Sequence, residues 1–190
     1  MFFILRSERA SDDEGGYLEV DDFVDGGVGL DEWGKGLPLS TKRSAFAVMA
    51  RAVRGYKGRP ADFYCFRIPL MSERMVKVLH TAGVDNIDTY PVTLIERMSG
   101  RRRPLFAVNI LGRVAAANMS QSEWSCDSDP PMRDVLFEKL VLSSTVPGDF
   151  LMFRMAESLS TILVHESVKQ ALEQAGLTGV ELVAPADGRR

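Results

Sequence analysis

Side chains that commonly perform chemistry are few in this sequence of 190 residues. Its histidines and cysteines are His80, His165, Cys65 and Cys126. A structural zinc site needs four such ligands at characteristic spacings, and neither Cys-x-x-Cys nor His-Glu-x-x-His occurs here. We therefore expect no metal site and no cofactor, and we expect both histidines to be packed or partly exposed side chains.

Catalytic nucleophiles are equally hard to find. The string Gly-x-Ser-x-Gly, which places a catalytic serine on a strained turn, is absent. Cys126 has the acidic neighbours Glu123, Asp127 and Asp129, and negative charge disfavours a reactive thiolate. Cys65 lies in an apolar run and is expected to be a small buried residue. Two reduced thiols are expected rather than a disulfide.

Two strings resemble sites that bind phosphate or RNA. Residues 29–36 match Gly-x4-Gly-Lys, but Gly36 stands where a serine or threonine would bind magnesium. Asp31 and Glu32 would also direct negative charge toward a phosphate. Residues 101–103 are three arginines without interleaved aromatic side chains, so we expect a solvated basic tip rather than an RNA contact.

Two helices are predicted by their end signals. Ser72 is a plausible N-cap for a helix over residues 73–80, and Gly83 stands where a helix commonly ends. A second helix is predicted over residues 166–175 and ends at Gly176. Each follows a predicted strand and precedes an apolar run.

The remaining regular structure is predicted to be strands. Residues 99–103 are expected to form the loop of a hairpin between two of them. Residues 42–56 fit a helix or a strand, and residues 118–131 are expected to be a polar loop. The predicted strands are 2–6, 17–20, 63–68, 92–95, 105–111, 135–142, 151–155, 162–164 and 180–183.

Together these elements predict an α+β fold, a mostly antiparallel sheet with two or three helices packed against it. We expect a single domain over residues 1–190, with an acidic, glycine-rich segment at 1–36 and a frayed tail at 185–190. No apolar run approaches the roughly 18 residues that span a bilayer, and the start of the chain does not fit a signal peptide. No membrane association is therefore expected.

Charge is unevenly distributed. Residues 1–32 hold ten acids and two bases, a net charge of −8, which leaves +5 for the remainder of a chain whose net charge is −3. Such a chain has no general attraction for nucleic acid. The acidic stretch is either a solvated loop or a surface that meets a basic partner, and Trp33 is either a core residue or an interface anchor. The candidate contact residues are Asp21, Asp22, Asp25, Asp31, Glu32 and Trp33.

Several segments, taken in order, are similar to the blocks of one protein family. They are Phe2 to Leu5, Trp33 with Gly36-Leu37-Pro38, Ser72 to Gly83 with Tyr90-Pro91-Val92, Val108 to Leu111 with Asn118 and Ser120, and Phe153-Arg154 with Val164 to Lys169 and Leu177 to Val180. In these segments the chain resembles the eleventh family of polymorphic-toxin immunity proteins. Asn118 departs from the aspartate that the family often carries.

The resemblance implies a cytoplasmic protein that binds and neutralises a cognate toxin, usually encoded beside it, without catalytic residues. Two other hypotheses remain open from the residues. One is a regulatory adaptor that binds a signalling protein such as a small GTPase. The other is an enzyme or small-molecule binder, which a deep pocket holding His165 or Cys126 beside perturbed carboxylates would favour.

Overall fold

Strands make up most of the regular structure. The computed structural model describes residues 1–7, 17–24, 30–39, 45–53, 56, 60–65, 68–126, 134–146 and 148–187. Strands account for 45% of the structure and helices for 16%. The strands are β1 (Phe2–Ser7), β2 (Leu18–Val24), β3 (Phe46–Ala52), β4 (Phe63–Cys65), β5 (Pro69–Met71), β6 (Ile87–Glu96), β7 (Arg102–Ile110), β8 (Arg113–Val114), β9 (Glu123–Cys126), β10 (Val135–Lys139), β11 (Met152–Met155), β12 (Ile162–His165) and β13 (Val180–Val183). The helices are α1 (Leu30–Trp33), α2 (Glu73–Thr81), α3 (Glu166–Gln174) and the 3-10 turn η1 (Pro185–Asp187).

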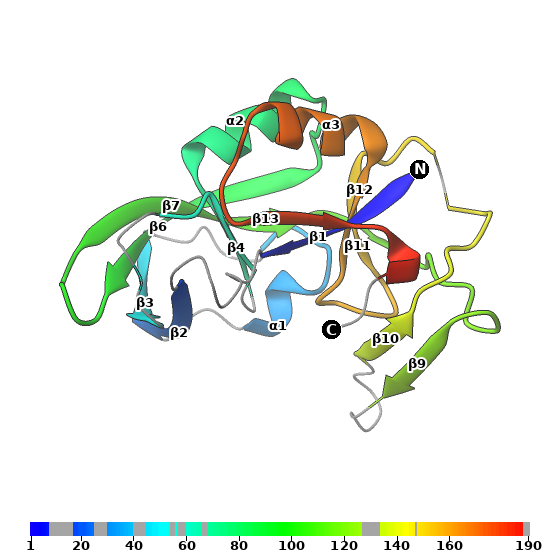
Figure 1. Cartoon of the computed structure of the whole chain (residues 1–190), viewed down its shortest axis with the longest axis horizontal. Helices are drawn as coiled ribbons and strands as arrows, with labels where there is room; N and C mark the ends of the chain where they lie inside the picture. The colour runs from blue at the N-terminus through cyan, green and yellow to red at the C-terminus, as the bar shows by residue number, and fades with distance from the viewer. Residues whose placement is uncertain are drawn as a thin grey trace.

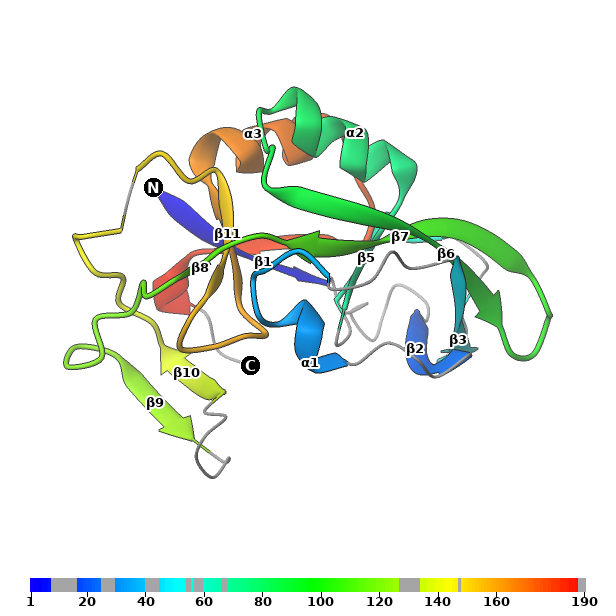
Figure 2. The ribbon, with the colours of Figure 1, turned by 180° about the vertical axis from the view of Figure 1, so that it is seen from behind.

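The strands form three sheets rather than one. A six-stranded sheet has the order β2-β3-β6-β7-β5-β4, and a five-stranded sheet has the order β13-β1-β12-β11-β8. Strands β9 and β10 form a separate two-stranded sheet, which extends away from the helices (Figure 1). The same three groups are visible from behind (Figure 2).

The expected α+β class, with two or three helices packed on a mostly antiparallel sheet, is therefore wrong, because the protein is mostly β. Strands also form where the sequence carries many polar residues. Strand β9 (Glu-Trp-Ser-Cys) lies inside the predicted polar loop, and the ambiguous stretch at residues 42–56 contains β3. Pairing with a neighbouring strand stabilises such segments, and the apolar pattern of a segment alone does not reveal that pairing.

Both predicted helices are confirmed. The Ser72 hydroxyl accepts a hydrogen bond from the Met75 N–H (3.1 Å) and so caps α2. Gly83 follows the helix with a φ of 92°, a conformation that glycine adopts without steric cost. His165 caps α3 in the same manner, since its Nδ1 accepts from the Ser167 N–H (3.3 Å).

We expect Ser72→Ala to lower the free energy of unfolding by about 1–2 kcal/mol. The substitution removes the α2 cap and also a hydrogen bond from the Ser72 hydroxyl to the Asp62 carboxylate (2.6 Å). Urea denaturation followed by circular dichroism measures the loss. Ser72→Thr keeps the hydroxyl and serves as the control; a loss as large as that of Ser72→Ala would contradict the capping role.

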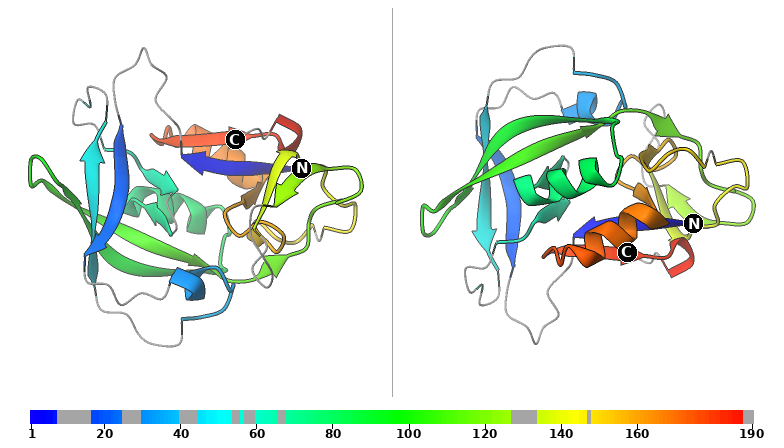
Figure 3. Two further views of the ribbon diagram at one scale, coloured as in Figure 1. Left: turned by 90° about the horizontal axis from the view of Figure 1, so that it is seen from below. Right: turned by 90° about the horizontal axis from the view of Figure 1, so that it is seen from above.

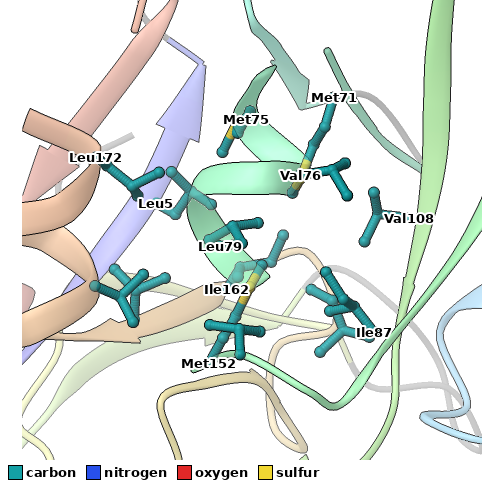
Figure 4. Packing of buried hydrophobic residues seen from close by; sticks show 14 of the residues in the cluster. Leu5, Met71, Met75, Val76, Leu79, Ile87, Val108, Met152, Ile162 and Leu172 are labelled. Carbon is teal, nitrogen blue, oxygen red and sulfur yellow. The ribbon is translucent and has the colours of Figure 1, made fainter. Parts of the chain in front are cut away.

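Helices α2 and α3 lie side by side and cover one side of the molecule (Figure 1). Their apolar faces meet residues of both large sheets. Met75 and Leu79 of α2, Leu172 of α3, Leu5 of β1 and Val108 of β7 belong to one buried cluster (Figure 4). The two large sheets are thus joined through a shared core beneath the helices.

A second buried cluster lies within the six-stranded sheet and positions the acidic segment. Leu18 and Val20 of β2 contribute to it together with Trp33 of α1. Phe46 of β3 and Leu94 of β6 also belong to it. Burial of these side chains therefore fixes β2 and α1 against the same core.

The predicted end of the strand at residues 63–68 needs correction. Pro69, the residue after that range, begins a second strand, β5, and pairs with Cys65 of β4 in antiparallel register. Proline is tolerated as the first residue of a strand because its missing N–H is not needed there. The predicted hairpin around residues 99–103 is confirmed as the β6–β7 pair, in which Ile95 faces Arg102.

Candidate partner-binding surface

The acidic candidate residues fall on two elements. Asp21 and Asp22 lie in β2, whereas Asp31, Glu32 and Trp33 lie in α1, a single helical turn where the sequence predicted a loop. Side-chain placement is described for Asp21, Glu32 and Trp33 but not for the other two residues. The sixth candidate, Asp25, lies outside the described residues.

Strand β2 forms an edge of the six-stranded sheet and pairs with β3. The Val53 N–H donates to the Tyr17 carbonyl (2.9 Å), so these two residues form a hydrogen-bonded antiparallel pair. Because such pairs alternate along a ladder, the backbone groups of Leu18 and Val20 point away from β3. A bulge between Val20 and Asp22 then shifts the register. The edge therefore presents backbone groups between acidic side chains.

The outer face of this sheet carries paired charges. A carboxylate oxygen of Glu19 lies 2.6 Å from a guanidinium nitrogen of Arg51, which stands directly opposite on β3. Asp21 binds Arg97, with 2.9 Å between the Arg97 Nε and a carboxylate oxygen. Both pairs are partly exposed to solvent, so each is expected to contribute less than about 1 kcal/mol. The negative charges of Glu19 and Asp21 are thus already paired with arginines of the same chain.

Trp33 is a core residue. Its side chain is 1% exposed and meets the rings of Phe46 and Tyr90 edge to face, with centroid distances of 6.4 and 5.3 Å. Of the two alternatives raised by the sequence, the structure therefore favours the core residue. Glu32 beside it is partly buried and has a partner of its own, so it is not a free charge.

The exposed tryptophan is instead Trp124, which the sequence placed in a polar loop. It is 46% exposed on β9, and its indole N–H donates to the Met119 carbonyl (3.3 Å). An exposed aromatic side chain on a projecting hairpin is typical of interface anchors. The only signal in the sequence was the polar surroundings of Trp124 between Glu123 and Ser125, which alone do not predict a strand.

The residues considered for catalysis do not assemble. His80 lies on α2 with its Nδ1 3.0 Å from the Val84 carbonyl, and His165 caps α3. Both cysteines are free, and Cys65 is exposed rather than buried, because only Phe63 and Tyr64 of β4 face the interior. Among the described residues, no group of three or more histidine, cysteine, aspartate or glutamate side chains is arranged to hold a metal.

A small pocket lies against the five-stranded sheet and contains neither His165 nor Cys126. Its lining includes Ile4, Arg6, Val135, Phe137, Ser158 and Thr161. An enzyme or small-molecule binder was expected to hold His165 or Cys126 in a deep pocket, and this pocket holds neither residue. No helix in the described part of the chain is long and apolar enough to cross a membrane.

Arg154 is a buried charge that the sequence did not indicate. Its side chain is 4% exposed, and burial lowers the pKa of its guanidinium. Its Nη1 donates to the Leu159 carbonyl, while its Nε and Nη2 have no hydrogen-bond partner among the described residues. Arg154 therefore holds the loop after β11, while two of its guanidinium nitrogens have no hydrogen-bond partner among the described residues.

Asn118, which departs from the family pattern, organises a turn. Its Nδ2 donates to the Gln121 side chain (2.9 Å), and its Oδ1 accepts from the Ser120 hydroxyl (2.8 Å). An ionised aspartate would lose the donated bond. The amide therefore fits a structural role at this position.

These features define a mostly β protein whose six-stranded sheet carries charged pairs on one face. Comparison with family models identifies an immunity protein family, Imm11, whose model matches residues 8–187. The match covers nearly the whole chain, so the protein belongs to this family. A search of curated proteins found no match.

Proposed function

We propose that the protein neutralises a cognate bacterial toxin by binding it in the cytoplasm, with residues Asp21–Trp33 as the leading contact segment. The observation that carries this proposal is the family match over residues 8–187. The protein would act as a single domain, without catalysis or a cofactor and without contact to nucleic acid or membrane. Its family is one of immunity proteins, and neutralisation requires tight binding rather than turnover.

The charge of the segment supports rapid encounter with a basic toxin surface. Between Glu19 and Trp33 the chain carries six acids and no base. Complementary charge raises the association rate and suppresses wrong partners. The exposed pair of Asp21 with Arg97 is weak enough for a basic group of the toxin to join it or replace it.

In this proposal Trp33 acts indirectly. Because its ring is buried against Phe46 and Tyr90, it holds α1 on the core and leaves the neighbouring acids to make the contact. The segment is therefore fixed at one end by a core residue and at the other by β2 pairing with β3.

We expect the triple change Asp21→Asn, Asp22→Asn and Asp25→Asn to slow association with the purified product of the neighbouring toxin gene roughly tenfold at low salt. The difference should shrink as salt screens the exposed charges. Surface plasmon resonance over a salt series measures both effects.

A control with the same change in net charge separates local contact from overall steering. It replaces three exposed acids elsewhere, Asp85→Asn, Asp149→Asn and Glu181→Gln. An association rate equal to that of the wild type for the first variant at every salt concentration would refute the acidic contact. A wild-type protein that does not bind the toxin would refute the immunity function itself.

A further inference from the structure

Local hydrogen bonds hold the tip of the β6–β7 hairpin. The Glu96 N–H donates to the Arg101 carbonyl (2.9 Å), and the Gly100 N–H donates to the Glu96 carbonyl (2.8 Å). The Ser99 hydroxyl accepts from the Arg101 N–H (3.2 Å). Gly100 has a φ of 67°, which a residue with a side chain rarely adopts. These contacts favour one conformation of the tip, and a tip that is already ordered loses less entropy on binding.

An apolar side chain occupies the apex of this tip. Met98 is 87% exposed, although turn positions are usually polar. The Met98 side chain therefore does not pack in the hydrophobic core. Methionine is flexible and polarisable, and it adapts to apolar pockets of varied shape. The hairpin projects from the body of the molecule, so the apex is accessible (Figure 3).

Two arginines at the tip are available for a partner. Arg97 is bound to Asp21, and Arg103 donates to the Tyr56 hydroxyl (3.0 Å). Arg101 and Arg102 are exposed, and neither side chain makes an ion pair or hydrogen bond with the described residues. The tip thus combines one exposed apolar side chain with two uncompensated positive charges.

We propose that this tip, residues 97–102, enters an acidic pocket of the toxin, with Met98 against apolar side chains at its base and Arg101 and Arg102 against carboxylates at its rim. Arginine and buried apolar contacts are the features that dominate protein interfaces. Single-stranded RNA would require stacking aromatics, and the tip has none. The proposal rests on the proposed function, since it assigns a contact to the same toxin.

The Asp21–Arg97 pair places the tip beside the acidic segment. A partner that covers both must present a basic surface next to an acidic pocket. Matching two adjacent patches of opposite sign excludes partners that are uniformly acidic or uniformly basic. The two contacts would therefore select one toxin more stringently than either contact alone.

The test measures binding of the full-length protein to the purified product of the neighbouring toxin gene. We expect Arg101→Glu with Arg102→Glu to weaken the equilibrium affinity about 10- to 100-fold, and Met98→Ser to accelerate dissociation severalfold. A matched control reverses two exposed bases elsewhere, Arg113→Glu and Lys139→Glu, and should change affinity less than threefold. Thermal unfolding should stay unchanged for the tip variants because their side chains lie outside the core.

The outcomes separate this inference from the proposed function. If the wild type binds the toxin and the tip variants bind equally well, the tip contact is wrong and the immunity function stands. If the wild type binds a single-stranded RNA oligonucleotide and the double arginine variant does not, the tip recognises nucleic acid and the protein-pocket assignment is overturned. If the wild type does not bind the toxin, both proposals fail.

Discussion

Trp33→Ala should lower the free energy of unfolding by about 3–5 kcal/mol, the range for large-to-small changes of a buried aromatic residue. Trp33 is 1% exposed and belongs to the cluster that includes Leu18, Val20 and Phe46. Its removal would leave a cavity between α1 and the six-stranded sheet. Denaturation by guanidinium chloride followed by circular dichroism measures the loss.

Trp33→Phe is the matched control. It keeps an aromatic ring against Phe46 and Tyr90 and removes an indole N–H that has no hydrogen-bond partner among the described residues. We expect less than half the loss of the alanine variant, together with wild-type toxin binding. A small loss for Trp33→Ala would contradict the core role, and lost binding by a stably folded Trp33→Phe would mean that Trp33 contacts the partner.

Gly179→Ala should destabilise the protein by about 2–4 kcal/mol through steric overlap and backbone strain. Gly179 has a φ of 72°, and an added Cβ would lie 2.4 Å from the Ala61 Cβ and 3.0 Å from the Phe63 carbonyl oxygen. The turn before β13 thus passes directly over the chain that leads into β4. To remove this steric overlap, the backbone at residue 179 or the backbone at residues 61–63 would have to move.

Gly176→Ala is the control that separates the backbone strain of a positive φ from the steric overlap with Ala61. Gly176 also has a positive φ, 58°, but an added Cβ would meet no atom within 4 Å. Its replacement should cost only about 1 kcal/mol. Chemical denaturation of both variants gives the difference, and equal losses would show that the approach to Ala61 does not matter.

Elements with local signals could be predicted from the sequence. Ser72 and Gly83 mark the ends of α2, and both act through atoms within a few residues of themselves. The β6–β7 hairpin is similarly local, since Ser99 and Gly100 form its turn. Such contacts need no knowledge of distant segments.

The fold class could not be predicted because it depends on distant pairing. Strand β3 pairs in parallel with β6, and β11 pairs in parallel with β8. Two parallel strands are joined by a long connection, so no short turn motif in the sequence predicts that they pair. Nor does the apolar pattern of a strand indicate which of the three sheets that strand joins.

The residues that carry the family resemblance do not by themselves indicate a contact surface, because several of them lie inside the protein. Trp33 and Arg154 are buried, Ser72 caps a helix, and Gly179 allows a close approach between two chain segments. These positions maintain the fold and report little about what binds outside. Asp21 was found by its charge, yet its pairing with Arg97, the residue that follows β6, depends on the sheet order.

Within the described residues, the edge of β2 opposite β3 pairs with no other strand, and such an edge favours aggregation. Leu18 and Val20 turn backbone donors and acceptors outward, and a second copy of the chain could add to such a row and begin an aggregate. Glu19, Asp21 and the bulge before Asp22 are the devices that natural proteins use to prevent this. We therefore expect these acids to limit self-association, and replacing Asp21 and Asp22 to probe toxin binding would also weaken that protection.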